Sequence, residues 1–247
     1  MAEPVDAADA GWAFVDLHCH TSASFDSLAS PRSVVAAAAR RGLTHLTITD
    51  HDTIDGALEA QAAAPAGVTV IVGEEIRTAD GDLVGAFLSR AVPPGLSALE
   101  TIAAVREQGG LVGIPHPFDR LRGSLGRRGW LGGGSLVGLA SQVDWIEAWN
   151  ARLILGDGNA RAASLAREAG VPGVAVSDAH TTLEVGVAST ALSLAYGDPG
   201  IPTGLLAALR GGARLTTGRA SIYVRALTPI AKVIQRARGR GRVRVRE

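Results

Sequence analysis

Residues 14–21 read FVDLHCHT, an apolar run that ends in two histidines. Alternate residues of a β-strand point to the same face, so His18 and His20 can reach one metal ion while Cys19 faces the other way. As buried core residues, the two histidines would each need a hydrogen-bond partner. The pattern therefore favours a metal-binding pair over two structural histidines. Cys19 itself is interpreted as a small buried hydrophobe rather than a ligand.

Outward from this strand, short β-rich runs alternate with alanine-rich helical segments. Such alternation predicts βα units around a mostly parallel sheet. About seven steps in one domain favour an α/β fold of the distorted (βα)7, TIM-like barrel type. An open doubly wound sheet is the structural alternative, but no G-x-G-x-x-G follows a strand. Further strands are predicted at 43–50, 68–75, 83–88, 111–115, 143–149, 171–177 and, weakly, 214–217, and helices at 31–41, 101–108, 159–169 and 202–210.

Potential metal ligands follow the predicted strands, all in the same polarity. The carboxyl ends of barrel strands converge, so we expect these residues to form an active site there. Imidazole and carboxylate without a thiolate cluster suit Zn²⁺, Mn²⁺ or Fe²⁺, and their number implies two or three ions with a bridging carboxylate. His45 lies within a strand and is interpreted as structural. The clusters are His18 with His20, Asp50 with His51 and Asp52, Glu74 with Glu75, His116, and Asp178 with His180.

Read together, five motifs resemble those of the PHP (polymerase and histidinol phosphatase) family. The resemblance covers about residues 14–223 and implies a distorted seven-stranded β/α barrel. It also implies phosphoesterase chemistry at a cluster of up to three metals. The motifs are DLHCHT at 16–21, TDHD at 49–52, GEE at 73–75, PHP at 115–117 and SDAH at 177–180.

The same resemblance implies a ligand set. The first metal would be held by His18, His20, Glu75 and Asp178. Glu75 would bridge to a second metal bound by His116, and a third would lie among Asp26, His51 and His180. The family commonly has a further histidine in the next strand, where this sequence has Asp82, so the second metal lacks a ligand unless Asp82 or water replaces it.

Other polar residues are candidates for supporting roles. Asp50, like Asp82, is either a ligand or a partner that orients one. Glu147 and Asn150 either orient a ligand or cap a strand end. Arg120, Arg122 and Arg152 are candidates for neutralising a phosphate. The first two begin a Gly- and Arg-rich insertion, residues 120–141, interpreted either as a lid or as a mobile surface loop.

The resulting hypothesis is hydrolysis of a phosphate ester by in-line attack of a metal-bound hydroxide, with Asp178 and His180 as the catalytic candidates. Expected substrates are small phosphomonoesters or nucleotides, with short RNA a further candidate. One alternative is an amidohydrolase-type metal hydrolase. Another is a metal-binding regulator without turnover, which the departure at Asp82 favours.

Composition predicts a cytoplasmic protein without a membrane partner. The 247-residue chain has one cysteine, no signal-like leader and no apolar run of membrane-spanning length. We expect a flexible leader at 1–12, the barrel at 13–225, and a C-terminal helix with an arginine-rich tail at 226–247. Residues 232–247 carry seven positive side chains and one negative, which indicates either a solvated terminus or contact with RNA or an acidic partner. Oligomeric state is not predicted.

Overall fold

The computed structural model describes residues 11–119, 123–127, 135–153 and 156–241. Arg120, Arg122, most of the predicted leader and part of the insertion therefore lie outside the described residues. The strands are β1 (Trp12–Cys19), β2 (His45–Ile48), β3 (Thr69–Arg77), β4 (Asp82–Ala86), β5 (Leu111–Ile114), β6 (Trp145–Asn150), β7 (Gly173–Val176), β8 (Ser189–Ser193) and β9 (Ala213–Thr216). The helices are α1 (Pro31–Arg40), α2 (Asp55–Ala62), α3 (Ala98–Glu107), α4 (Leu136–Ala140), α5 (Gly158–Ala169), α6 (Pro202–Gly211), α7 (Ile222–Arg225) and α8 (Leu227–Ala237).

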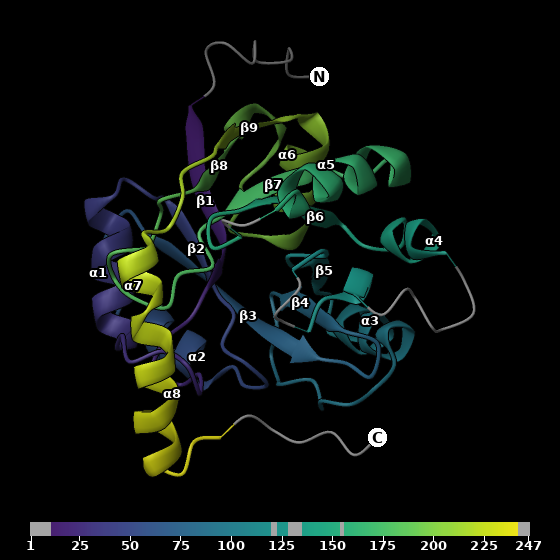
Figure 1. The fold of residues 1–247 in the computed structure, drawn as a ribbon. Coiled ribbons are helices and arrows are strands. Elements are labelled where there is room, and N and C mark those ends of the chain that lie inside the picture. Colours follow the sequence, from purple (N-terminus) through teal and green to yellow (C-terminus); the bar gives the residue numbers. More distant parts are fainter. Residues whose placement is uncertain (1–10, 120–122, 128–134, 154–155, 242–247) are drawn as a thin grey trace.

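The strands form one mixed sheet in the order β7-β6-β5-β4-β3-β2-β1-β8-β9 (Figure 1). The first and last strands of the β1–β7 series approach each other, because Asp178 N donates to His18 O at 2.9 Å and His20 N donates to Ala179 O at 2.8 Å. The sheet is thus a nearly closed barrel, and the predicted distorted (βα)7 barrel is confirmed. Strands β8 and β9 extend it beyond β1, in antiparallel pairing.

Three features of the sheet differ from the sequence-based expectation. Strand β4 pairs antiparallel with both of its neighbours, β3 and β5, so the sheet is not uniformly parallel. Strand β8 is absent from the predicted set. Trp12, which was assigned to the leader, begins β1.

Local sequence explains where the main helices begin. Ser30 Oγ accepts a hydrogen bond from Ser33 N at 3.2 Å, and Pro31 occupies the first turn of α1. Ser97 and Glu100 form a reciprocal capping box at α3. These caps satisfy backbone donors that a helix start leaves without partners, and they fix the positions at which the βα loops end and the helices begin.

Apolar residues pack on both faces of the sheet. One cluster joins the helices to the outward-facing strand residues, and the other fills the barrel around Trp145, Leu17 and Leu205. Cys19 is fully buried in the outer cluster, as its interpretation as a small hydrophobe requires. The pairing register of β1 with β2 shifts between Asp16 and Cys19, so a bulge lies where the histidines begin.

The C-terminal helix α8 runs along the outside of the barrel (Figure 1). Its buried residue Gln235 donates from Nε2 to the carbonyl oxygens of Ser22, Ser24 and Ser27, at 2.7, 2.9 and 2.8 Å. Helix α8 is therefore held to the loop that follows β1 by hydrogen bonds. Among the described residues, no helix has the length and apolarity needed to cross a bilayer.

Candidate metal centre

Three groups of histidines and carboxylates converge at the carboxyl ends of the barrel strands. In each group the ligand atoms lie within 4.8 Å of one another, and nearly all of the side chains are buried. His20 belongs to two groups, as does Glu75, so the three groups form one continuous cluster. They are His20 with Asp26, His51 and His180; His18 with His20 and Glu75; and Glu75 with Asp82 and His116.

Glu75 is the centre of this cluster. Its Oε2 atom lies 3.2 Å from His18 Nε2, 3.3 Å from His20 Nε2 and 3.3 Å from His51 Nδ1. Its Oε1 atom lies 3.0 Å from His116 Nε2. The two oxygens of one carboxylate thus face different imidazoles, which is the arrangement of a bridging ligand. The surrounding imidazoles hold the pKa of Glu75 well below its usual value, although burial alone would raise it.

Asp26 organises the group farthest from His116. Its Oδ2 atom lies 3.5 Å from His51 Nε2 and 3.4 Å from His180 Nε2. Burial raises the pKa of Asp26, but the two imidazoles outweigh that effect and hold it well below the usual range. Its Oδ1 atom is buried and has no hydrogen-bond partner among the described residues. This oxygen is therefore available to a cation.

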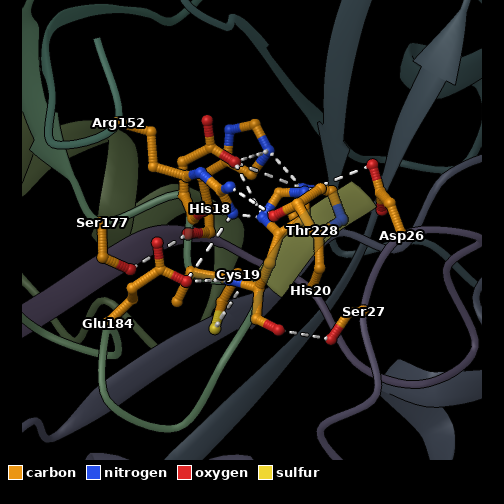
Figure 2. A network of polar contacts seen from close by, with 12 residues as sticks. His18, Cys19, His20, Asp26, Ser27, Arg152, Ser177, Glu184 and Thr228 are labelled. Atoms are coloured by element: carbon orange, nitrogen blue, oxygen red, sulfur yellow. Dashed lines mark hydrogen bonds and ion pairs between the residues drawn. The ribbon is translucent and has the colours of Figure 1, made fainter. Parts of the chain in front are cut away.

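Most rings are oriented by a second contact at Nδ1. Such contacts fix the ring and leave Nε2 directed into the cluster, as metal-binding histidines require. The Nδ1 contacts are His18 to Glu147 Oε1 at 2.5 Å, His20 to Ser24 Oγ at 3.1 Å, His116 to Ser124 Oγ at 3.1 Å and His180 to the carbonyl oxygen of Asp178 at 2.9 Å. Figure 2 shows the His18 and His20 rings beside Cys19, whose side chain is turned away from them.

Glu147 and Asn150 lie behind the ligands rather than within the three groups. Glu147 Oε2 accepts hydrogen bonds from His116 N at 2.9 Å and from Asn150 Nδ2 at 2.8 Å. Asn150 Nδ2 also lies 3.0 Å from Asp178 Oδ2. One carboxylate and one amide thereby connect His18 in β1 with residues that follow β5 and β7.

Asp50 lies in a similar supporting position on the other side of the cluster. Its Oδ1 atom accepts hydrogen bonds from Thr21 N at 2.6 Å and from Ser24 Oγ at 2.8 Å. The same Ser24 hydroxyl contacts His20 Nδ1. Asp50 thus acts through Ser24 on the orientation of His20 and belongs to none of the three groups.

Two residues at the cluster have backbones in the left-handed region. His116 has φ 25° and Asp178 has φ 52°. Positive φ is costly for residues with a side chain and is tolerated where the surrounding structure enforces it, often at functional sites. At both positions the sharp turn after the strand, β5 or β7, directs the side chain toward the cluster at the carboxyl ends of the barrel strands.

The electrostatic environment raises the pKa of some histidines of the cluster and lowers that of another. For His18 and His51, burial lowers the pKa, but neighbouring carboxylates outweigh it; the pKa of His18 lies well above its usual value and that of His51 is raised to about 9. For His180, burial together with the nearby Arg152 guanidinium lowers the pKa to about 3. A neutral His180 and the negative charge around His18 both favour binding of a cation.

Arg152, whose guanidinium lies near His180, is held by two side-chain contacts. Its Nη2 atom donates to Thr228 Oγ1 at 2.6 Å, and its Nη1 atom lies 3.6 Å from Glu184 Oε2 (Figure 2). Glu184 in turn accepts a hydrogen bond from His180 N at 3.0 Å. Arg152 is therefore buried in a structural network, and its role toward phosphate stays a prediction, as do those of Arg120 and Arg122.

Sequence reasoning did not identify several residues of this site. Ser24, Glu184 and Gln235 carry no local signal, because their partners lie elsewhere in the chain or depend on loop conformation. Lys232 is another, with Nζ 3.9 Å from Asp26 Oδ2. The sequence indicated that Lys232 lies on the polar side of a basic, amphipathic helix. It did not indicate which part of the barrel that helix packs against.

The donor set fits divalent metal ions. Donor atoms that share an ion at about 2.1 Å lie roughly 3.0–3.4 Å apart, which is close to the separations found here. His18 Nε2 and His20 Nε2 are 2.9 Å apart, and two ring lone pairs at that distance repel unless a proton or cation lies between them. Together with the buried Asp26 Oδ1, these contacts describe a multinuclear site of nitrogen and oxygen ligands.

Comparison with known proteins agrees with this architecture. The PHP domain family matches residues 16–125, and the PHP-associated family matches residues 156–213. An uncharacterized protein of Methanocaldococcus jannaschii is 40% identical over 46% of this chain and 72% of its own length. A second from the same organism is 32% identical over 70% of this chain and 67% of its own. The chain belongs to the PHP domain family.

A relative with a named activity and two solved structures extend the comparison. A 5′-3′ exoribonuclease of Haemophilus influenzae is 36% identical over 42% of each chain. A two-domain protein from Bacteroides vulgatus, described as containing a predicted PHP-like metal-dependent phosphoesterase, has TM-score 0.68 and 17% identity, covering 88% of this chain and 68% of its own. An amidohydrolase from Chromobacterium violaceum has TM-score 0.52 and 18% identity, covering 68% and 87%. At these identities the structures establish the shared fold.

Proposed function

We propose that this protein is a metal-dependent phosphoesterase acting on small phosphomonoesters, nucleotides or short oligonucleotides. The observation that carries the proposal is the position of Glu75, whose two oxygens face His18, His20 and His51 on one side and His116 on the other. Adjacent cations sharing such a carboxylate would lie close enough to act on one phosphate group. The family membership and the exoribonuclease relative support the same class of reaction.

The proposed ligand roles follow the three groups. His18, His20 and Glu75 would hold the first ion. Asp178, which lies outside the three groups, would join them, because its Oδ1 atom is near both histidines. Asp82 would join Glu75 and His116 at the second ion, and Asp26, His51 and His180 would hold the third, with His20 at its edge. The nitrogen and oxygen donors suit Mn²⁺, Zn²⁺ or Fe²⁺. When bound, these ions would lower the pKa of a water molecule and neutralise charge on the phosphate.

Asp178 is the residue proposed to position the attacking water. Its Oδ2 atom is held 3.0 Å from Asn150 Nδ2, and its Oδ1 atom lies 3.5 Å from His20 Nε2 and 3.8 Å from His18 Nε2. A carboxylate fixed in this way can orient a water and accept its proton. His180, with a pKa lowered to about 3, remains neutral at physiological pH and keeps Nε2 available as a ligand.

Phosphate release from a panel of phosphomonoesters, nucleotides and 5′-phosphorylated short RNAs tests the proposal, with Mn²⁺ supplied to the full chain. His18→Ala and Asp178→Ala should abolish turnover. Asp198→Asn is the matched control, since its carboxylate pairs with His45 and not with the cluster, and it should retain activity. A chain that binds metal stoichiometrically yet releases no phosphate from any substrate would contradict the proposal.

An amidohydrolase is the second candidate, because the Chromobacterium violaceum amidohydrolase shares the fold. Running amide substrates beside the phosphate esters separates the two reactions. A regulator without turnover was suggested by the departure at Asp82. The carboxylate of Asp82 nevertheless groups with Glu75 and His116, so the position still offers a metal-binding oxygen and gives that alternative less support.

A further inference from the structure

A cavity of about 510 Å³ opens directly beside the third group of candidate ligands. Asp26 and His180 form part of its wall, so the cavity and the metal cluster share side chains. Its size falls within the range of about 300–1,000 Å³ that is typical of small-molecule sites. A molecule bound at the cluster through a phosphate would therefore have this cavity as a neighbouring space.

The rest of the cavity wall is uncharged. Apolar side chains come from the loop before α1 and from α8: Leu28, Ala29, Leu227, Ile230 and Ala231. Hydroxyl groups complete the lining: Ser30, Ser33, Thr181, Thr182 and Thr228. Among the described residues that line the cavity, none is a lysine or an arginine, and Asp26 is the one carboxylate.

Two large apolar residues of the cavity wall are left uncovered by the fold. Leu227 is 46% exposed and Ile230 is 54% exposed. Both project from α8 into the cavity lining. Exposing such side chains in a concave site is unfavourable unless a ligand covers them, so they indicate an apolar partner at this position.

The wall formed by α8 is tied to the metal cluster at two points. Thr228 accepts the hydrogen bond from Arg152 at 2.6 Å, and Arg152 lies beside His180 through Glu184. Gln235 donates to the backbone of the loop that carries Asp26. The distance between cavity wall and ligands is thus fixed by buried polar contacts. Helices α7 and α8 lie outside both matched family segments, the second of which ends at residue 213.

We propose that this cavity receives the alcohol part of the phosphate ester and selects substrates in which that part is uncharged and largely aliphatic. The inference rests on the proposed phosphoesterase function and narrows its substrate class. The shared wall identifies the occupant, because the alcohol part of an ester whose phosphate is bound near Asp26 and His180 would have this cavity as its adjacent space. Apart from the candidate ligand His180, the described residues that line the cavity include no aromatic side chain on which a base could stack, so nucleotides fit it poorly.

Equilibrium binding of n-alkylphosphonates, which are not hydrolysed, tests this assignment without relying on turnover. Calorimetric titrations would use the full chain with Mn²⁺, comparing inorganic phosphate, methylphosphonate and pentylphosphonate. Each methylene that becomes buried should tighten binding by about fourfold. We expect pentylphosphonate to bind at least about tenfold more tightly than methylphosphonate. Adenosine monophosphate, the control, should show no such gain in affinity over methylphosphonate.

Two matched variants on α8 test whether the cavity wall is the source of the preference for pentylphosphonate. Ile230→Ser should reduce the preference for pentylphosphonate by about fivefold while leaving the affinity for inorganic phosphate unchanged. Val233→Ser is the control, because Val233 is 71% exposed on the same helix and does not line the cavity. It should change neither affinity. Both positions are exposed, so the substitutions should leave folding intact.

The outcomes separate the two proposals. Metal-dependent phosphate binding with no dependence on alkyl length would overturn the cavity assignment and leave the phosphoesterase proposal standing. Chain-length dependence that persists equally without metal would show an apolar site unconnected to the cluster, which also overturns it. Failure to bind any phosphate or phosphonate in the presence of Mn²⁺ would count against both proposals.

Discussion

Glu147 Oε1 lies 2.5 Å from Nδ1 of His18, so a buried carboxylate directs the ring whose Nε2 faces Glu75. The contact has the form of the carboxylate–histidine pairs that orient metal ligands and raise their basicity. Because Glu147 also accepts from His116 N, its effect reaches two of the three groups.

Replacing this carboxylate should weaken metal binding without removing a ligand. Glu147→Gln keeps the side-chain size but loses the charge opposite His18, and loss of such a partner typically costs ten- to a hundredfold in metal affinity. Competition titration with a chromogenic chelator measures this. Asn159→Asp, a polar change next to Asn150 that leaves Glu147 in place, provides a comparison. Wild-type affinity in Glu147→Gln would show that the contact does not orient His18.

Asp82 should supply a ligand at the second group. Asp82→Asn removes its charge and should lower the number of tightly bound ions by one per chain, while Asp82→His restores the histidine common in the family and should retain it. Native mass spectrometry counts the ions. Asp80→Asn is the matched control, since Asp80 accepts the hydrogen bond of Ala98 N at the start of α3. Equal metal content in wild type and Asp82→Asn would exclude Asp82 as a ligand.

Gln235 should act as a positioning residue for the loop that carries Asp26. Gln235→Leu leaves three carbonyl oxygens without their donor, which should lower the free energy of unfolding by about 2 kcal/mol. It should also weaken binding of one metal ion and accelerate amide exchange in residues 22–27. Val233→Ser again serves as control. A stability loss with no change in metal binding or in loop exchange would assign Gln235 a purely structural role.

His45 should make stability depend on pH below neutrality. Burial lowers its pKa beneath the ordinary value of 6.5, and the hydrogen bond to Asp198 offsets only part of this effect. The unfolded chain then takes up a proton more readily than the folded chain as the pH falls below 6.5. The contribution of neutral His45 to the free energy of unfolding is therefore complete above pH 6.5. It is lost as the pH falls through the folded-state pKa.

His45→Gln should remove that contribution. Denaturant unfolding of metal-free protein at pH 7.5 and pH 5.5 should show a smaller loss of stability in the variant than in wild type. Because other histidines titrate in both proteins, only the difference between them reports on His45. Parallel pH dependence in the two proteins would contradict the assignment.

Most of the candidate ligands could be predicted from sequence because they lie in or just after a strand, where local alternation and short motifs define their direction. Asp26, seven residues beyond the end of β1, was expected only from the family resemblance. The antiparallel direction of β4 was also within reach. Only four residues separate Arg77, which ends β3, from Asp82, which begins β4, and a connection that short cannot support a parallel crossover. The length of the loop was the overlooked signal.

The contacts of the C-terminal helix could not be predicted in the same way. Gln235 and Ser22 are 213 positions apart, and Arg152 and Thr228 are 76 apart. No periodicity joins such positions, since their meeting depends on how the completed barrel presents its loops. The helix itself was expected from its composition, whereas the surface it covers is a property of the tertiary structure.

The candidate ligands and the cavity wall on α8 come from separate parts of the chain, which has an evolutionary consequence. Among the described residues, all candidate ligands lie between residues 18 and 180, whereas one wall of the adjoining cavity comes from residues 227–231. Under the proposed cavity assignment, substitutions at Leu227, Ile230 and Ala231 would change substrate selection without replacing a candidate ligand, whereas Thr228 bonds Arg152 and would have to be kept. A lineage built on this scaffold could diversify at the apolar positions of its C-terminal helix, and laboratory libraries confined to those codons would sample new specificities.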